Sequence, residues 1–216
     1  MSPGQALVPI CQNTSYPFQS VFVRFGSVRS NFLGTLRTHC LNIYQFEIIK
    51  RSFRVRDKDV ISQLYKSLVR PHLEYSVQAW RPHFQKDIDF IEGVQRRATK
   101  LILDLKDKSY EERLRCQNIT TLDTRRLRGD LIEVFNIFKG FENVDPIKFF
   151  ELSTTPIRGH SLKIVKPRCR LDVRKYSFAH SVVDMWNSLD EGIVACDSIN
   201  SFKNRLDESL YCRGFI

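Results

Sequence analysis

The side chains of this chain that are best suited to chemistry are cations in four short clusters. Lys and Arg number 34 against 24 Asp and Glu, which gives a formal net charge of +10. Clustered cations neutralise phosphates without reading bases, and a neighbouring aromatic ring can stack on an unpaired base. The clusters therefore predict contact with the backbone of RNA or DNA, and a solvated basic face remains the alternative. Their members are Arg54 and Arg56; Arg96, Arg97 and Lys100; Arg125 and Arg126; and Lys163, Lys166, Arg168, Arg170, Arg174 and Lys175. The last cluster is followed by the aromatic residues Tyr176 and Phe178.

Catalytic and metal-binding groups lack the spacing that their chemistry needs. Asp87 and Asp89 stand two apart in a predicted helix and point to different faces, so they cannot share a metal ion or a proton. The six cysteines form no Cys-x-x-Cys pair, and no second Cys or His follows at zinc-finger spacing. The sequence also lacks phosphate-binding loops, nucleophile elbows and the His-Glu-x-x-His motif. We expect no catalytic residue, no metal site and no cofactor.

Helices are the elements that must position the basic clusters. Apolar residues recur at steps of three and four along most of the chain after residue 48, which is typical of amphipathic helices. Alternation between Thr154 and Tyr176 instead predicts two short strands around Lys166-Pro167-Arg168. The predicted fold class is mainly α, with a small β ribbon followed by two C-terminal helices. We expect the helices to begin after Asp57, at Pro71, near Lys86, at Tyr110, after Thr121, after Ser177 and after Ser198. The helix that begins near Lys86 should end near Leu105. Ser109 and Glu112 spell a capping box for the helix at Tyr110, and Gly140 should end the helix that begins after Thr121.

Composition divides the chain into three regions. Residues 1–46 contain no acidic residue and are predicted to be a poorly ordered leader. A mitochondrial transit peptide is the alternative, although Pro3, Pro9 and Pro17 obstruct the amphipathic helix that import requires. Residues 47–153 form a helical region, and residues 154–216 form the basic ribbon and the C-terminal helices. No transmembrane segment is predicted, because charged or polar residues interrupt every apolar run. We expect an intracellular protein, nuclear or cytoplasmic, with no membrane partner.

Five blocks resemble, in collinear order, the region after the polymerase active site in reverse transcriptases of LINE-type non-LTR retrotransposons, the Jockey and chicken-repeat group. The first block is VRDKDVISQLYKSLVRPHLEYSVQAWRPHFQKDIDFIEGVQRRATKLI, residues 55–102. The second and third are SYEERL, residues 109–114, and TTLDTRRLRGDLIEVFNIFKGFENVDPIKFFELS, residues 120–153. The last two are RGHSLKIVKPRCRLDVRKYSFAHSVVDMWNSL, residues 158–189, and INSFKNRLDESL, residues 199–210.

That resemblance implies that the helix with Arg96, Arg97 and Lys100 contacts nucleic acid, and that this chain does not polymerise it. Residues 55–105 would correspond to the helical thumb, which grips the primer-template duplex, and Arg96, Arg97 and Lys100 would contact its backbone. The catalytic carboxylates of this family belong to a Y/F-x-D-D block upstream of the matching region, and this chain has no two adjacent aspartates. Two-metal phosphoryl transfer needs those carboxylates, so we expect no enzymatic activity.

The predicted function is therefore that of a truncated fragment: a thumb-like helical bundle and tail that binds nucleic acid without sequence specificity. Full-length proteins of such elements are further candidate partners. Two alternatives remain open. One is a transposon-derived reading frame with no selected activity, which exposes apolar surface that formerly packed on the rest of the polymerase. The other is a protein-interaction module.

Overall fold

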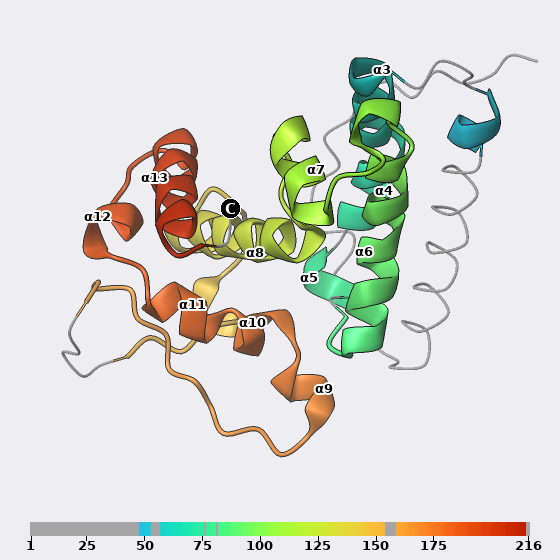
Figure 1. Cartoon of the computed structure of the whole chain (residues 1–216). Helices are drawn as coiled ribbons and strands as arrows, with labels where there is room; N and C mark the ends of the chain where they lie inside the picture. The colour runs from blue at the N-terminus through green and yellow to red at the C-terminus, as the bar shows by residue number, and fades with distance from the viewer. Residues whose placement is uncertain (1–47, 53–56, 76, 81, 154–158, 215–216) are drawn as a thin grey trace, which may run out of the picture.

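A computed structural model of the chain describes residues 48–52, 57–75, 77–80, 82–153 and 159–214 (Figure 1). These residues are mainly helical, as the sequence predicts. The predicted leader, residues 1–46, and the basic residues Arg54 and Arg56 lie outside the described residues. Among the described residues, no helix is long and apolar enough to cross a membrane.

The first hydrophobic core lies under the helices of the N-terminal half. Asp57 caps the first of them, since its carboxylate accepts the N–H of Asp59 at 3.1 Å. Pro71 stands at the start of a new helix, where its missing N–H costs nothing. Tyr65, Leu73 and Ile91 are buried in this core. The elements are α3 (Lys58–Leu64), a π-helical turn (Tyr65–Val69), α4 (Arg70–Glu74), α5 (Val77–Trp80) and α6 (Gln85–Lys100).

The helix that follows Phe84 ends earlier than predicted. α6 stops at Lys100 rather than near Leu105, because Ile102 adopts an extended backbone and begins a 3-10 turn over Leu103–Leu105. This break turns both Ile102 and Leu105 into the core, where they are 0% and 4% exposed. The next helix, α7 (Tyr110–Gln117), begins at the predicted capping box. Glu112 N–H donates to the Ser109 hydroxyl at 3.3 Å, and Ser109 N–H donates to the Glu112 carboxylate at 2.9 Å.

One long helix, α8 (Leu122–Lys139), connects the two halves of the molecule (Figure 1). It begins at the predicted cap, where Thr121 Oγ1 accepts the N–H of Thr124, and it ends at Gly140, whose φ of 72° suits glycine. Leu122 belongs to the first core, whereas the later apolar residues of α8 belong to a second core. The second half of α8 therefore packs with residues 160–210.

The second core is rich in aromatic side chains. Trp186 and Phe202 are fully buried, and the rings of Phe135 and Phe202 stack with their centroids 4.1 Å apart. The helix predicted after Ser177 is divided at Val182 into two shorter helices, and the Ser198 hydroxyl caps the last helix by accepting the N–H of Ser201. A further short helix, α12, lies between α11 and α13, and the sequence pattern did not predict it. The helices are α10 (Phe178–Ser181), α11 (Val183–Asn187), α12 (Glu191–Val194) and α13 (Ile199–Cys212).

The described residues contain no strand, so the predicted β ribbon is not observed there. One isolated antiparallel bridge joins Leu152 and Ile164. Where the second strand was expected, the chain forms a turn of helix, α9 (Asp172–Lys175). Leu171 and Val173 are 73% and 64% exposed, so their alternation with polar residues reflects no buried sheet face. With no neighbouring strand to pair with, the backbone bonds to itself within the turn.

Candidate nucleic-acid interface

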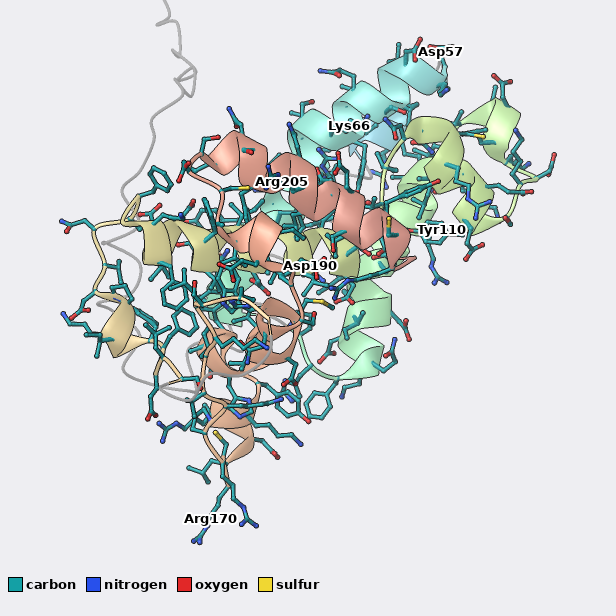
Figure 2. The ribbon with its side chains drawn as sticks, turned by 90° about the vertical axis from the view of Figure 1, so that its left-hand side faces the viewer. Asp57, Lys66, Tyr110, Arg170, Asp190 and Arg205 are labelled. Atoms are coloured by element: carbon teal, nitrogen blue, oxygen red, sulfur yellow. The ribbon has the colours of Figure 1, made fainter. Side chains whose placement is uncertain are left out.

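Residues 163–175, here called the basic segment, are fastened to the second core near both ends. At the first end, Ile164 is buried and exchanges two hydrogen bonds with the Asn187 side chain, at 2.9 and 2.8 Å. Just after the other end, Phe178 is buried in the second core. His180 Nε2 also lies 3.0 Å from the carbonyl oxygen of Pro167, which ties the chain after the segment back to its first part. Between these points the chain projects outward, and Figure 2 shows Arg170 at its tip, far from Asp57. Because the basic segment is held near both of its ends and projects between them, the side chains between these points face solvent.

Five of the six cations in the basic segment are exposed. Lys166 forms an ion pair with Asp184, and Lys163 is half-buried. The only acidic residue of the segment is Asp172, so the local charge is strongly positive. The exposed cations besides Lys166 are Arg168, Arg170, Arg174 and Lys175. Exposed cations on a projecting segment can reach successive phosphates of a strand.

A second exposed cluster lies in the last two turns of α6. Arg96, Arg97 and Lys100 are all exposed, as the sequence predicts for a helix whose other face is apolar. The guanidinium carbon of Arg96 lies 4.9 Å from the ring centroid of Tyr110 on α7, which holds this side chain in place. Cations in the last turn of a helix also interact favourably with the negative end of the helix dipole, so this cluster stabilises α6 as well.

The arginines at the start of α8 are engaged within the protein. Arg125 pairs with Glu74 of α4, with Nη2 and Oε2 3.1 Å apart, and this hydrogen-bonded contact raises the pKa of Arg125. Arg126 is only 2% exposed and donates to the carbonyl of Leu73 at 3.4 Å. A buried guanidinium cannot reach a phosphate. Both side chains hold α8 against α4, a role that sequence reasoning missed because Glu74 lies 51 residues away from Arg125.

The two exposed clusters do not merge into one surface. The basic segment approaches the N-terminal end of α6, where the rings of Tyr176 and His83 stack, whereas Arg97 lies near its other end. Along α6 the rise from Gln85 to Arg97 is about 18 Å at 1.5 Å per residue. Figure 1 shows the same arrangement, with α9 beside the start of α6 and α7 beside its end. A ligand that contacts both clusters must therefore extend along most of α6.

Aromatic side chains accompany the basic segment. The His83 and Tyr176 rings are stacked with centroids 4.2 Å apart and an interplanar angle of 13°. The ring of Phe84 lies on the same group, 4.0 Å from His83. The sequence singled out Tyr176 and Phe178 as neighbours of the basic run, but Phe178 is buried in the second core. His83 and Phe84 were missed, since no local signal links them to residues about ninety positions later.

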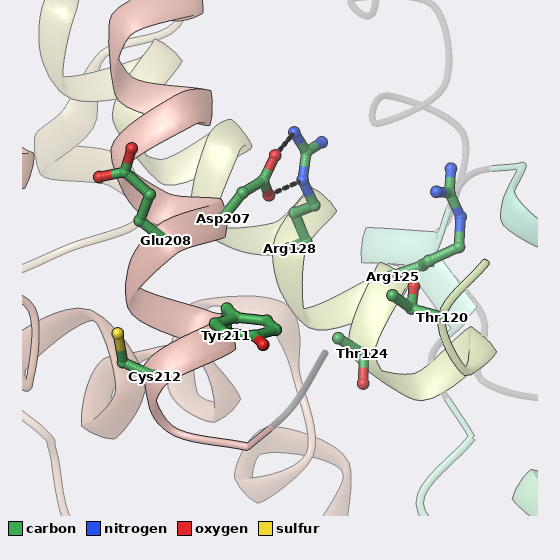
Figure 3. Close-up of a pocket in the computed structure, with 8 residues that line it drawn as sticks. All are labelled: Thr120, Thr124, Arg125, Arg128, Asp207, Glu208, Tyr211 and Cys212. Carbon is green, nitrogen blue, oxygen red and sulfur yellow. Dashed lines mark hydrogen bonds and ion pairs between the residues drawn. The ribbon is translucent and has the colours of Figure 1, made fainter. Parts of the chain in front are cut away.

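A groove of about 620 Å³ separates the first half of α8 from the end of α13 (Figure 3). Arg128 and Asp207 face each other across it in a two-pronged ion pair with N···O distances of 2.5 and 2.8 Å. Tyr211 and Cys212 line the same groove and are exposed. Because its charged groups of opposite sign are paired, the groove presents no excess of positive charge for a phosphate.

A buried polar network joins α6, α7 and α8. Glu92 accepts a hydrogen bond from Tyr110 and another, at 3.0 Å, from the backbone N–H of Leu122. Gln95 accepts from Tyr65 at 2.7 Å and donates to the carbonyl of Thr120 at 3.0 Å. Burial raises the pKa values of both tyrosines, so their hydroxyls remain protonated donors. These buried polar groups are hydrogen-bonded to one another, and they stabilise the packing of α6 against α7 and the start of α8.

A second buried carboxyl lies on α8. Glu133 is 9% exposed, and one of its oxygens has no hydrogen-bond partner among the described residues. Burial, followed by the nearby charges of Glu142 and Asp130, raises the pKa of Glu133 to about 7. In the described part of the chain, no group of three or more His, Cys, Asp or Glu side chains is arranged to hold a metal ion.

Comparison of the chain with protein-family models, curated proteins and solved structures finds no match. The resemblance to LINE-type reverse transcriptases therefore rests on the sequence blocks alone. The geometry adds two exposed basic clusters, one of which carries aromatic rings.

Proposed function

We propose that this protein binds nucleic acid through its phosphate backbone, without sequence specificity and without catalysis. We further propose that it is a remnant of the thumb and tail of a LINE-type reverse transcriptase, with α3 to α8 as the thumb-like bundle. The observation that carries the binding proposal is the basic segment, which exposes five cations on a projecting stretch anchored near both ends by buried Ile164 and Phe178. No base-reading geometry is required for such contacts.

The proposal explains the charge distribution better than general solubility does. A solvated basic face that serves only solubility needs no fixed geometry, yet this segment is held by buried Ile164 and Phe178 at its two ends. Its cations also stand beside exposed rings, a combination that single-strand-binding proteins use. The cations of α6 provide a second contact, near the other end of α6, for a longer strand or a duplex.

The experiment that tests the proposal is equilibrium binding at low salt, after circular dichroism and size-exclusion chromatography have shown that the protein is folded. The ligands are two fluorescent single strands of unrelated sequence and an RNA–DNA hybrid, each of the same length. We expect binding to both strands with equal affinity, because phosphate contacts carry no sequence information. A folded protein that binds none of the three at low salt contradicts the proposal. A protein that is not folded alone favours instead a reading frame with no selected activity.

A further inference from the structure

We propose that the rings of Phe84, His83 and Tyr176, here called the ring stack, form a site on which an unpaired base of a single strand stacks. The inference rests on the proposed function and goes beyond it, because it assigns a specific place and a preference for unpaired bases over bare phosphates. The site is not visible in the sequence. Tyr176 directly follows the basic segment, and the other two rings precede α6.

The ring stack is built as a continuous series of aromatic contacts. His83 is in the middle, 4.0 Å from Phe84 and 4.2 Å from Tyr176 between ring centroids. Phe84 is 55% exposed and Tyr176 38% exposed, values that are high for rings of this size in a folded chain. Large exposed rings fixed by their neighbours are suited to binding rather than to the core.

Each outer ring is covered by a lysine ammonium. Lys86 Nζ lies 5.5 Å from the centroid of Phe84, and Lys175 Nζ lies 5.2 Å from that of Tyr176. An exposed cation–π contact is weak, and a stacked base is a stronger partner for the same ring face. A base that stacks there displaces the lysine, and the released ammonium then stands next to the phosphate of that nucleotide. The same side chains therefore supply both halves of a nucleotide contact.

The charges around the ring stack favour a polyanion that continues along the basic segment. Arg170 and Arg174 precede Tyr176 in the sequence and are exposed. Asp87 and Asp172 are the nearby acids in the sequence, and each stands at the start of a helix. A duplex keeps its bases paired and stacked within the helix, so the rings cannot reach them, whereas a single strand offers a free base face at every nucleotide. The expected ligand is accordingly single-stranded RNA or DNA.

The test compares strands that carry the same phosphates with and without bases. The probes are dT8, rU8 and an eight-unit abasic strand with tetrahydrofuran in place of each nucleoside, all fluorescently labelled. We expect the protein to bind dT8 or rU8 about tenfold more tightly than the abasic strand, within the range for one to two stacked bases. Comparison of dT8 with rU8 distinguishes DNA from RNA as the preferred source of the base.

Four variants assign the preference to the ring stack. Phe84→Ala and Tyr176→Ala should each reduce the preference for bases several-fold while leaving affinity for the abasic strand unchanged. Tyr176→Phe keeps the ring and should keep the preference. Tyr211→Ala is the matched control, since it removes a ring that is 69% exposed on α13 and should change nothing. Circular dichroism confirms that each variant is folded.

The outcomes separate this inference from the proposed function. Equal affinity for all three strands, with a normal salt dependence, leaves phosphate binding intact and overturns the stacking site. A base preference that survives both alanine variants also overturns it. Failure to bind any strand at low salt overturns the proposed function and the stacking site together.

Discussion

Substitution of Glu133 by Gln should remove a pH-dependent loss of stability. This carboxyl is buried on α8, and its pKa is raised from about 4.5 to about 7 by burial and by the charges of Glu142 and Asp130. A raised pKa in the folded protein means that the fold favours the protonated acid. The contribution of the protonated Glu133 carboxyl to the stability of the fold is therefore fully present below about pH 4.5 and is lost as pH rises through about 7.

The magnitude follows from the difference in pKa between the folded and unfolded chain. Each unit is worth about 1.4 kcal/mol, so the upper limit is about 3.4 kcal/mol, and partial screening by water reduces it to about 2 kcal/mol. Glutamine has the shape of the protonated acid but does not ionise. Glu133→Gln should consequently match the original protein at pH 4.5 and exceed its stability by about 2 kcal/mol at pH 8.

Urea denaturation followed by circular dichroism at pH 4.5, 6, 7 and 8 measures this difference, and subtraction of the two curves cancels the titration of all other groups. Glu151→Gln is the control, because Glu151 is exposed and its variant should show a flat difference curve. A flat curve for Glu133→Gln, or a variant that is less stable than the original protein at pH 8, refutes the reasoning.

Three further substitutions test the packing that positions the basic clusters, each by urea denaturation. Arg128→Ala should cost only about 0.5 to 1 kcal/mol, because its ion pair with Asp207 is partly exposed, and a double-mutant cycle with Asp207→Ala should recover that energy as coupling. Gln95→Leu should cost about 2 kcal/mol or more, since it leaves Tyr65, Tyr110 and the carbonyl of Thr120 without their hydrogen bonds to this buried side chain. Ser109→Ala removes half of the capping box of α7 and should cost about 1 kcal/mol. If Ser109→Ala lowers the free energy of unfolding more than Gln95→Leu does, the result contradicts the burial assigned to Gln95.

Local signals were the part of the fold that the sequence made predictable. The capping box of Ser109 and Glu112, the cap at Thr121 and the stop at Gly140 each depend on residues within four positions of one another. Their geometry is decided by the chain itself, whatever packs on it. Alternation alone was less informative, because Leu171 and Val173 alternate with polar residues yet lie at the start of a helical turn, where both are exposed.

Contacts between distant residues explain most of what the sequence did not reveal about the site. The sequence predicts that Arg125 contacts phosphate, whereas in the structure it forms an ion pair with Glu74. No rule of sequence spacing connects these two residues. The meeting of His83 with Tyr176 depends in the same way on how the second core packs against the first. Exposure of Arg168 and Arg170 was predictable in principle, since charged residues rarely lie inside a core.

The most direct test of phosphate binding is the salt dependence of affinity for a single strand, measured for the original protein and for Arg168→Glu/Arg170→Glu. Affinity should fall linearly with salt on logarithmic axes, with a slope of about 0.7 for each phosphate neutralised. The double variant should flatten that slope by about 1.4, because two contacts are lost. Lys106→Glu/Lys148→Glu changes the net charge equally at exposed positions outside the two clusters and should leave the slope nearly unchanged. Equal slopes for the two double variants would contradict binding through the basic segment.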